Sequence, residues 1–325
     1  RNLAVIRELK EARPDLVVVC GGFHPSLLPE VTLSNPEVDF IIVGEGEFSL
    51  PSLLRVLDEM GRTKTKALPA DGLQGVWSLH NGKMIERGRS TVVKDQDSLP
   101  LPDKDLYYSY NPSLKKLYTI IASRGCPYFC TYCNSATMNS FYLHNRQRYY
   151  RVRSVDNVMA ELRVAKERYR PSQVMFFDDV FASKLSWLRE FNQRYKEQIG
   201  LPFFCQTSPL IHNEESLELL ADSGCVLLEF GFQSANPEVR ERILNRKETN
   251  EEMRNLILLA KKKKIFTELD LIMNLPNETE EHIQQSLDFV LETRPHWVNV
   301  AYLQFHPKTP ITRIALEAGM LNPAD

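Results

Sequence analysis

The stretch "LYTIIASRGCPYFCTYC", residues 117–133, joins a strand-like apolar run to a loop with three closely spaced cysteines. Cys126, Cys130 and Cys133 have no fourth cysteine near them in the sequence. Thiolates bind soft metals, and both a closed structural zinc site and a four-ligand iron–sulfur cluster need a fourth protein ligand. Three thiolates alone therefore indicate a metal centre with one position left open for a substrate or cofactor.

Strand-like and helix-like segments alternate from residue 117 onward. The apolar runs are separated by segments with helical periodicity, and Ser154, Thr249 and Thr279 stand where helix N-caps are expected. Such alternation implies parallel strands joined by right-handed crossovers, which gives an open or closed α/β barrel. The predicted strands cover residues 117–123, 173–179, 202–208, 225–234, 266–274 and 297–305.

The first 112 residues have a different pattern. "DLVVVCGG" (15–22) and "VDFIIVGEGE" (38–47) read as buried strands that run into glycine turns, with helical segments before and after them. "LQGVWSLHNGKMIERGR" (73–89) predicts a β-hairpin turning at Asn81–Gly82, and a Pro- and Tyr-rich linker follows it. We therefore predict an α/β domain over 1–65, a hairpin and linker over 66–112, and the barrel over 113–325.

Composition excludes several classes of protein. The chain has 325 residues, 43% of them hydrophobic and 25% charged, as in ordinary globular proteins. A net charge of −2 gives no electrostatic case for a nucleic-acid partner, and no apolar run is long enough to span a bilayer. Six cysteines in this arrangement do not suggest a disulfide framework, so we expect a reducing, cytoplasmic location. Because the chain opens on Arg1 in mid-helix, we expect a trimmed N-terminus.

The CxxxCxxC spacing, with Tyr132 directly before the third cysteine, resembles the radical S-adenosylmethionine (SAM) enzymes. The resemblance covers residues 117–310 and implies a partial (β/α)6 TIM-like barrel with the cysteine loop after its first strand. It also implies that Cys126, Cys130 and Cys133 hold a [4Fe–4S] cluster whose fourth iron is chelated by SAM. One electron from the cluster then cleaves SAM to a 5′-deoxyadenosyl radical. A reductant such as flavodoxin or ferredoxin and a small-molecule or peptide substrate are the implied partners.

Other positions resemble the family in kind. Phe177, Asp178 and Asp179 end the second predicted strand, where relatives bind the amino group of SAM; either aspartate could instead cap a helix. Polar residues on the third and fourth strands stand where relatives contact the ribose or carboxylate, and they could also simply line a cavity. They are Gln206, Thr207, Glu229 and Gln233. Asn274 and Asn277 replace the glycines usual in relatives, and asparagine tolerates the left-handed backbone that such a turn requires.

The N-terminal segment resembles the second half of a cobalamin-binding, Rossmann-like domain found in one branch of this family. Its strand-end glycines, which would let the backbone approach the corrin, are Gly21, Gly22, Gly44 and Gly46. His24 could contact the corrin edge or cap a helix; ligation of cobalt fits its position less well. This branch implies a cobalamin-dependent methyltransferase acting on an unactivated carbon.

Two alternatives remain open from the sequence. One is a cobalamin-independent radical cyclase or rearrangement enzyme that uses the cluster alone. The other is a zinc-stapled binding module, in which His144 supplies the fourth ligand after a longer spacer. The arginines of "RQRYYRVRS" (146–154) could hold a carboxylate or phosphate, or form a solvated basic loop. The apolar settings of Cys20, Cys205 and Cys225 predict core positions.

Overall fold

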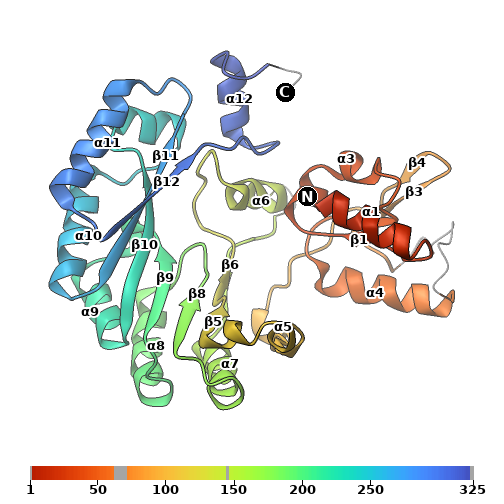
Figure 1. Cartoon of the computed structure of the whole chain (residues 1–325), viewed down its shortest axis with the longest axis horizontal. Helices are drawn as coiled ribbons and strands as arrows, with labels where there is room; N and C mark the ends of the chain where they lie inside the picture. Colours follow the sequence, from red (N-terminus) through yellow and green to blue (C-terminus); the bar gives the residue numbers. More distant parts are fainter. Residues whose placement is uncertain (1, 62–71, 144–145, 323–325) are drawn as a thin grey trace. The chain divides into compact units, whose positions relative to one another are not determined.

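The computed structural model describes residues 2–61, 72–143 and 146–322. The chain divides into two compact units, Arg1–Lys94 and Asp95–Asp325 (Figure 1). Each unit has its own main β-sheet.

The second unit is built on a six-stranded parallel sheet with the order β12-β11-β10-β9-β8-β5. The strands are β5 (Leu117–Ile120), β8 (Gln173–Phe176), β9 (Phe203–Thr207), β10 (Cys225–Gln233), β11 (Phe266–Met273) and β12 (Trp297–Tyr302). All six predicted strands are confirmed, and so is the parallel pairing. Within the described residues β5 and β12 do not pair, so the sheet is an open, partial barrel, as the predicted fold class requires.

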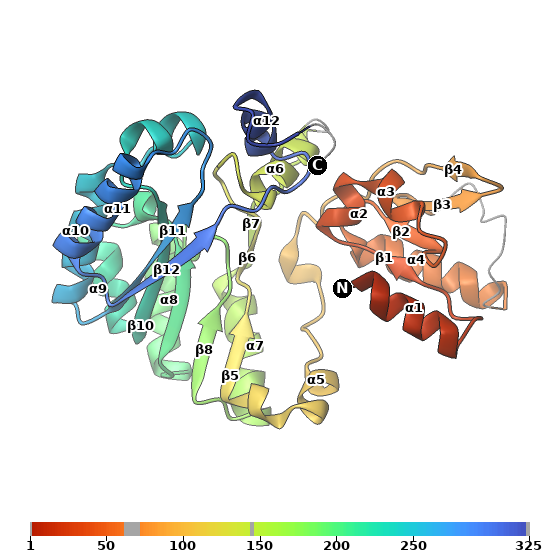
Figure 2. The same cartoon turned by 45° about the horizontal axis from the view of Figure 1, so that its top comes forward.

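Helices cover the outer face of this sheet, as both views show (Figures 1 and 2). They are α7 (Val155–Arg168), α8 (Leu185–Gln198), α9 (Glu214–Asp222), α10 (Asn250–Lys262) and α11 (Glu280–Thr293). The side chains of Ser154, Thr249 and Thr279 each accept a hydrogen bond from a backbone N–H in the first turn, which confirms the predicted caps. Each cap satisfies a helix donor that otherwise has no partner.

Shorter elements surround the barrel. Helix α5 (Asp105–Tyr110) precedes β5, α6 (Asn134–Leu143) lies between β5 and β8, and α12 (Pro310–Glu317) follows β12. Strand β6 (Ser123–Arg124) pairs antiparallel with β7 (Arg151–Val152). The remaining turns are the 3₁₀ helices η1 (Gln96–Ser98), η2 (Pro112–Lys116) and η3 (Pro209–Ile211) and the π-helix η4 (Val239–Ile243). Of these, α6 and η4 flank the segments that form the candidate site.

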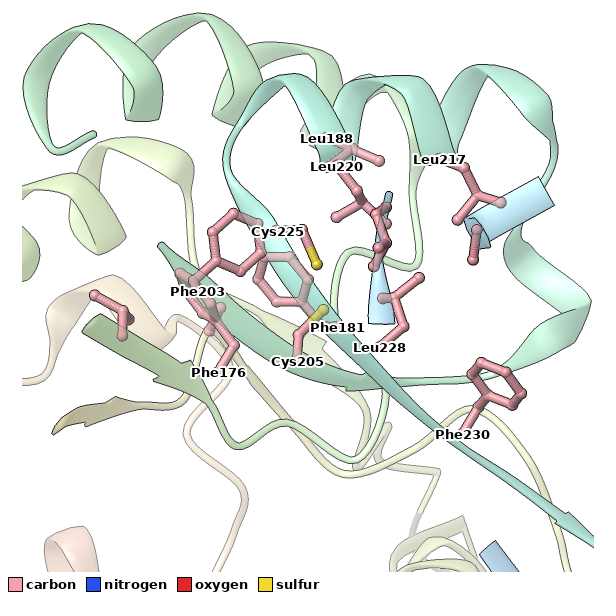
Figure 3. Close-up of a cluster of buried hydrophobic side chains, with 14 of the residues drawn as sticks. Phe176, Phe181, Leu188, Phe203, Cys205, Leu217, Leu220, Cys225, Leu228 and Phe230 are labelled. Carbon is pink, nitrogen blue, oxygen red and sulfur yellow. The ribbon is translucent and has the colours of Figure 1, made fainter. Parts of the chain in front are cut away.

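The core of the second unit lies between the sheet and the helices. Figure 3 shows Phe176 and Phe203 of the sheet packed near Phe181, with the side chains of Cys205 and Cys225 in the same layer. Both thiols are almost fully buried, as predicted, whereas Cys20 in the first unit is only partly buried. Aromatic rings in edge-to-face contact fill much of this layer, which gives the barrel wall a rigid backing.

The first unit has a four-stranded sheet with the order β1-β2-β3-β4. Strand β1 (Val19–Cys20) is parallel to β2 (Phe40–Ile42), and β3 (Val76–His80) and β4 (Lys83–Ile85) are antiparallel. The helices are α1 (Asn2–Ala12), α2 (Phe23–Leu27), α3 (Pro29–Leu33) and α4 (Gly46–Glu59). The predicted hairpin turns at Asn81 and Gly82, which both have positive φ as a two-residue type I′ turn requires.

The unit boundary differs from the predicted segments. The hairpin pairs with β2 and so completes the sheet of the first unit, which extends to Lys94. The sequence could not show this pairing, because a hairpin's own pattern does not say which third strand it joins. Across the described ranges, no helix has both the length and the apolar character needed to cross a membrane.

Candidate functional site

The cysteine loop leaves the barrel after β5 and β6 and ends at α6. Gly125 opens it with φ +76°, and a Cβ there would lie 2.6 Å from Cδ1 of Tyr149. Only glycine combines that backbone conformation with so close a neighbour. Cys126, Cys130 and Cys133 all line one cavity of about 200 Å³ at the carboxyl end of the strands. The structure thus brings the three predicted ligands together.

Hydrogen bonds tie this loop to the end of η4 and to the segment that follows it. Thr131 donates from its backbone N–H to the carbonyl of Leu244 (3.1 Å) and from its hydroxyl to the carbonyl of Ile243 (2.5 Å). The side-chain amide of Asn245 donates to the carbonyl of Phe129 (2.7 Å). The two segments are 112 to 116 residues apart in the sequence but are held as one piece.

The cavity disfavours uncompensated thiolates. Burial raises the pKa of Cys126 to about 12 and also raises that of Cys130. Three neighbouring thiolates become favourable here only with a positively charged metal centre among them. In the part of the chain that the structure describes, no three His, Cys, Asp or Glu side chains are grouped to hold a single metal ion. His144, the fourth ligand of the zinc alternative, lies outside the described residues.

Arg246 lies beside the cysteines, a contact that no pattern in the sequence indicates. Its Nη1 lies 3.7 Å from Sγ of Cys130 and donates to Oη of Tyr132 (3.0 Å). Its Nη2 donates to the carbonyl of Gly231 (2.7 Å), and its Nε donates to Glu248. Burial alone lowers the pKa of Arg246, but Tyr132, Glu248 and Cys130 together hold it above its usual range. The guanidinium is therefore a permanent buried positive charge at the cavity wall.

Polar side chains from adjacent strands form another wall of the cavity. Gln206 on β9 stands in register with Glu229 on β10 and donates to its carboxylate (2.8 Å). Asp270 on β11 accepts from Asn299 on β12 (3.2 Å). Burial and the charge of Asp270 raise the pKa of Glu229 to about 7. Glu229 can therefore bind or release a proton near neutral pH.

Gln233 at the end of β10 also lines this cavity. It is 7% exposed, and among the described residues its Oε1 has no hydrogen-bond partner. Its Nε2 occupies the space above Gly231, only 2.1 Å from where a Cβ would stand. A buried amide oxygen without a donor is costly, and a ligand hydroxyl or amine would satisfy it. Together with the thiols and carboxylates, this donor set fits a cluster and a polar organic cofactor.

The two aspartates after β8 have different positions. Asp179 lines the cavity and accepts from the hydroxyl of Ser135 (2.6 Å). Asp178 is 1% exposed and does not line it; its carboxylate accepts from the backbone N–H of Ala122 (3.1 Å) and the hydroxyl of Ser123 (2.6 Å). Asp178 thus holds the segment that enters the cysteine loop. Phe177 is half exposed and is likewise not among the lining residues.

Several residues of the cavity were missed from the sequence. Asp270 could have been found, because it alternates with apolar residues in "FTELDLIMN" just as Glu229 does in its own strand. Arg246 could not, because it follows an irregular π-helix and its contacts depend on long-range loop pairing. The predicted left-handed turn is present, with φ of 64° at Asn274 and 59° at Asn277.

In the first unit the predicted glycines form two turns at the strand ends. Gly22 and Gly44 have φ of +99° and +105°, values that favour glycine. Ser26 joins the turns, since its hydroxyl donates to the carbonyl of Gly22 (2.7 Å) and accepts from the N–H of Gly44 (2.9 Å). Gly21 is exposed at the first turn, and Gly46 begins α4. His24 is exposed on α2 beside the first turn.

Two family models match the chain. One, described as the radical SAM superfamily, matches residues 120–290, and the other, described as a B12 binding domain, matches residues 2–54. The first covers the barrel from the end of β5 into α11, and the second covers both glycine turns. These matches confirm the resemblance and the predicted cofactor types: an iron–sulfur cluster and SAM for the barrel, and cobalamin for the first unit.

Curated proteins are similar to this chain over most of its length. An uncharacterized methyltransferase of Pyrococcus horikoshii, PH0819, is 25% identical over 94% of this chain and 63% of its own length. The anaerobic magnesium-protoporphyrin IX monomethyl ester cyclase of Rubrivivax gelatinosus is 26% identical over 90% of this chain and 52% of its own. The chain thus spans between half and two thirds of these relatives.

Solved structures support the fold. The methyltransferase TsrM from Kitasatospora setae, solved with cobalamin and a [4Fe–4S] cluster, has a TM-score of 0.74 at 19% identity. The match covers 95% of this chain and 61% of the TsrM chain. The cobalamin-dependent radical enzyme OxsB has a TM-score of 0.70 at 18% identity, over 96% of this chain and 44% of its own. At such identities the likeness concerns the fold, and it confirms the predicted fold class.

Proposed function

Because the chain belongs to the radical SAM superfamily, we propose that it reductively cleaves SAM and uses cobalamin to methylate an unactivated carbon of its substrate. The observation that carries this proposal is the shared cavity, where Cys126, Cys130 and Cys133 face polar residues from three adjacent strands. A [4Fe–4S] cluster bound there supplies the electron that cleaves SAM to a 5′-deoxyadenosyl radical. The rest of the site binds and orients the reactants.

The chain's own residues divide the work of holding SAM. The three thiolates would supply the protein ligands of the cluster, and the cluster's remaining position would be left open to SAM. Asp179, exposed at the cavity edge, offers a carboxylate to the ammonium group. Gln233 offers its amide oxygen, which has no donor among the described residues, to a hydroxyl of the ribose. Gln206 and Glu229 line the same wall and extend this polar surface.

The remaining predicted positions receive different roles. Tyr132 is tied through its hydroxyl to Arg246, so its ring is held at the cavity between two cluster ligands of the sequence. Asp178 is a positioning residue, since its carboxylate accepts a hydrogen bond from the backbone before the cysteine loop. Phe177 presents an exposed ring after β8 and is free to contact substrate.

The first unit is proposed to hold cobalamin. Gly22 and Gly44 have positive φ and carry no Cβ, so the backbone of both turns can approach a large planar ligand closely. Ser26 fixes the two turns relative to each other. His24, exposed beside the first turn, is placed to contact the corrin edge.

Partners follow from the chemistry. The reaction needs one electron for each cleaved SAM, so a flavodoxin or ferredoxin is the proposed reductant, and a small molecule or peptide is the proposed substrate. Free, clustered thiols and an oxygen-sensitive cluster suit a reducing compartment, which supports a cytoplasmic location.

Anaerobic reconstitution tests the proposal. The protein is incubated with SAM and dithionite, with and without cobalamin, and 5′-deoxyadenosine is measured by mass spectrometry. We expect 5′-deoxyadenosine from the wild type and none above background from Cys130→Ser, with the variant still folded by circular dichroism. Purification with one zinc and no iron per chain, or unfolding of Cys130→Ser, would instead support the zinc-stapled module.

A ring-forming reaction is the second candidate. It is favoured by the likeness to a magnesium-protoporphyrin ester cyclase, which is as similar to this chain as the methyltransferase is. Cobalamin absorbance of the reconstituted protein separates a cobalamin enzyme of either kind from a radical enzyme that uses the cluster alone. Transfer of a labelled methyl group from SAM to a product then separates methylation from ring formation.

A further inference from the structure

The guanidinium of Arg246 is fixed by four partners at once. Nη1 faces Sγ of Cys130 and Oη of Tyr132, Nη2 faces the carbonyl of Gly231, and Nε faces Glu248. The side chain of Arg246 is 11% exposed, and that of Glu248 is 1% exposed. Because every guanidinium nitrogen has a partner, Arg246 cannot change its rotamer without losing several hydrogen bonds. The contact with the sulfur of Cys130 is therefore fixed by the surrounding structure.

Hydrogen bonds between the two loops also hold the distance between Nη1 of Arg246 and Sγ of Cys130. The loop that carries Arg246 is tied to the cysteine loop through Thr131 and through the amide of Asn245. Donor and sulfur therefore belong to one hydrogen-bonded piece of structure.

A positive charge in this position acts on electron transfer. Reduction adds one negative charge to a cluster, and part of that charge resides on the thiolate sulfurs. Hydrogen bonds to the sulfurs and nearby net charge are among the properties that set the potential of such clusters. Because Arg246 and Cys130 are both largely shielded from water, screening of their interaction is weak.

Glu248 opposes this effect from a greater distance. Its carboxylate pairs with Nε, on the side of the guanidinium away from the nitrogen that faces Cys130. The sulfur therefore lies nearer to the positive charge than to the negative one. Removal of the positive charge should lower the reduction potential of the cluster, and removal of the negative charge should raise it.

We infer that Arg246 is a positioning residue that raises the reduction potential of the [4Fe–4S] cluster by donating a hydrogen bond to the sulfur of Cys130. This rests on the proposed function, because it assumes a cluster at the three cysteines. Arg246 thereby makes the cluster easier to reduce before SAM binds, and Glu248 limits the size of the effect.

Redox titration of the reconstituted full chain, followed by electron paramagnetic resonance and without SAM, tests this inference. The variants are Arg246→Gln and Glu248→Gln, and the matched control is Arg242→Gln. Arg242 loses the same charge from the same segment, but its side chain is 78% exposed and pairs with Glu238. Omitting SAM removes any contribution from a contact between Arg246 and the cofactor's carboxylate.

At the wild-type midpoint potential we expect the ratio of reduced to oxidised cluster to fall about tenfold in Arg246→Gln, which is ~59 mV for a one-electron couple. The ratio should rise above one in Glu248→Gln and stay within about twofold of one in Arg242→Gln, since exposed charges are screened. An Arg246→Gln midpoint equal to that of Arg242→Gln would overturn the inference.

The variants also separate the possible failures. Arg246→Gln leaves Glu248 as a buried unpaired charge and could unfold; Glu248→Gln keeps the guanidinium and tests the opposite sign. A midpoint that falls, or does not move, in Glu248→Gln contradicts the inference. A wild type that binds no iron refutes the proposed function itself, whereas a normal iron content with unmoved midpoints refutes only the role of Arg246.

Discussion

Asp178 holds the segment before the cysteine loop with a buried carboxylate. Replacing it with asparagine tests whether ionisation of that carboxylate lowers the stability of the fold. The carboxylate accepts from the N–H of Ala122 and the hydroxyl of Ser123, and it is 1% exposed. Burial raises its pKa from 3.8 to about 6, although the two hydrogen bonds partly oppose that shift. Asparagine keeps the size and an acceptor oxygen and cannot ionise.

The sign of the pH dependence follows from the raised pKa. The native state binds a proton more tightly than the unfolded state, so the stability from this group is complete below pH 3.8 and is lost as the pH rises through 6. The difference between the two pKa values corresponds to about 3 kcal/mol in all, of which ~1.4 kcal/mol is lost between pH 5 and pH 7.5. At about 2–4 °C per kcal/mol, the melting temperature of the wild type should fall by about 3–6 °C relative to Asp178→Asn.

Calorimetry of the two proteins without cluster, at pH 5 and pH 7.5, measures this double difference. Other titrating groups cancel, because both proteins contain them. The account expects the melting temperature of Asp178→Asn, minus that of the wild type, to be larger at pH 7.5 than at pH 5. An equal difference at both pH values, or a larger one at pH 5, would show that the carboxylate is not buried with a raised pKa.

Three further substitutions probe separate parts of the structure. Gly231→Ala adds a Cβ that clashes with the side-chain amide of Gln233 and lies 3.6 Å from Nη1 of Arg246, an ordinary contact. We therefore expect an unchanged melting temperature but a roughly two- to tenfold weaker SAM affinity by equilibrium dialysis, as for one lost hydrogen bond; unchanged affinity would refute the role of Gln233. Gly44→Ala strains a turn at φ +105°, so cobalamin affinity should fall in absorbance titrations while Gly61→Ala, also at positive φ, leaves it intact; equal losses would count against the glycine turns. Thr249→Ala removes the capping box of α10, so the melting temperature should fall by about 2–4 °C, for a cap worth about 1 kcal/mol; no change would mean that the cap is not formed in solution.

Local patterns predicted most of the barrel. The six strands and the caps at Ser154, Thr249 and Thr279 depend on residues within a few positions of one another, so the sequence carries them directly. The cysteine spacing was informative for the same reason. The hairpin at Asn81–Gly82 was found, but its partner strand was not, because pairing with β2 is a long-range choice.

The site was predicted less completely than the fold. Asp178 and Asp179 are equivalent candidates in the sequence, yet neighbouring residues of an extended chain point to opposite sides, and only Asp179 reaches the cavity. Arg246 approaches Cys130 across 116 residues, through a loop whose shape no local pattern indicates. Such contacts depend on how loops at the ends of different strands meet, which only the folded chain determines.

The most direct test of the central claim is the iron content after anaerobic reconstitution. The account predicts close to four irons and four sulfides per chain in the wild type and in Cys205→Ser, whose sulfur lies in the core away from the cavity. It predicts a large loss of iron in Cys126→Ser, Cys130→Ser and Cys133→Ser, each with a folded barrel. Full iron content in any of these three variants, or equal loss in Cys205→Ser, would contradict it.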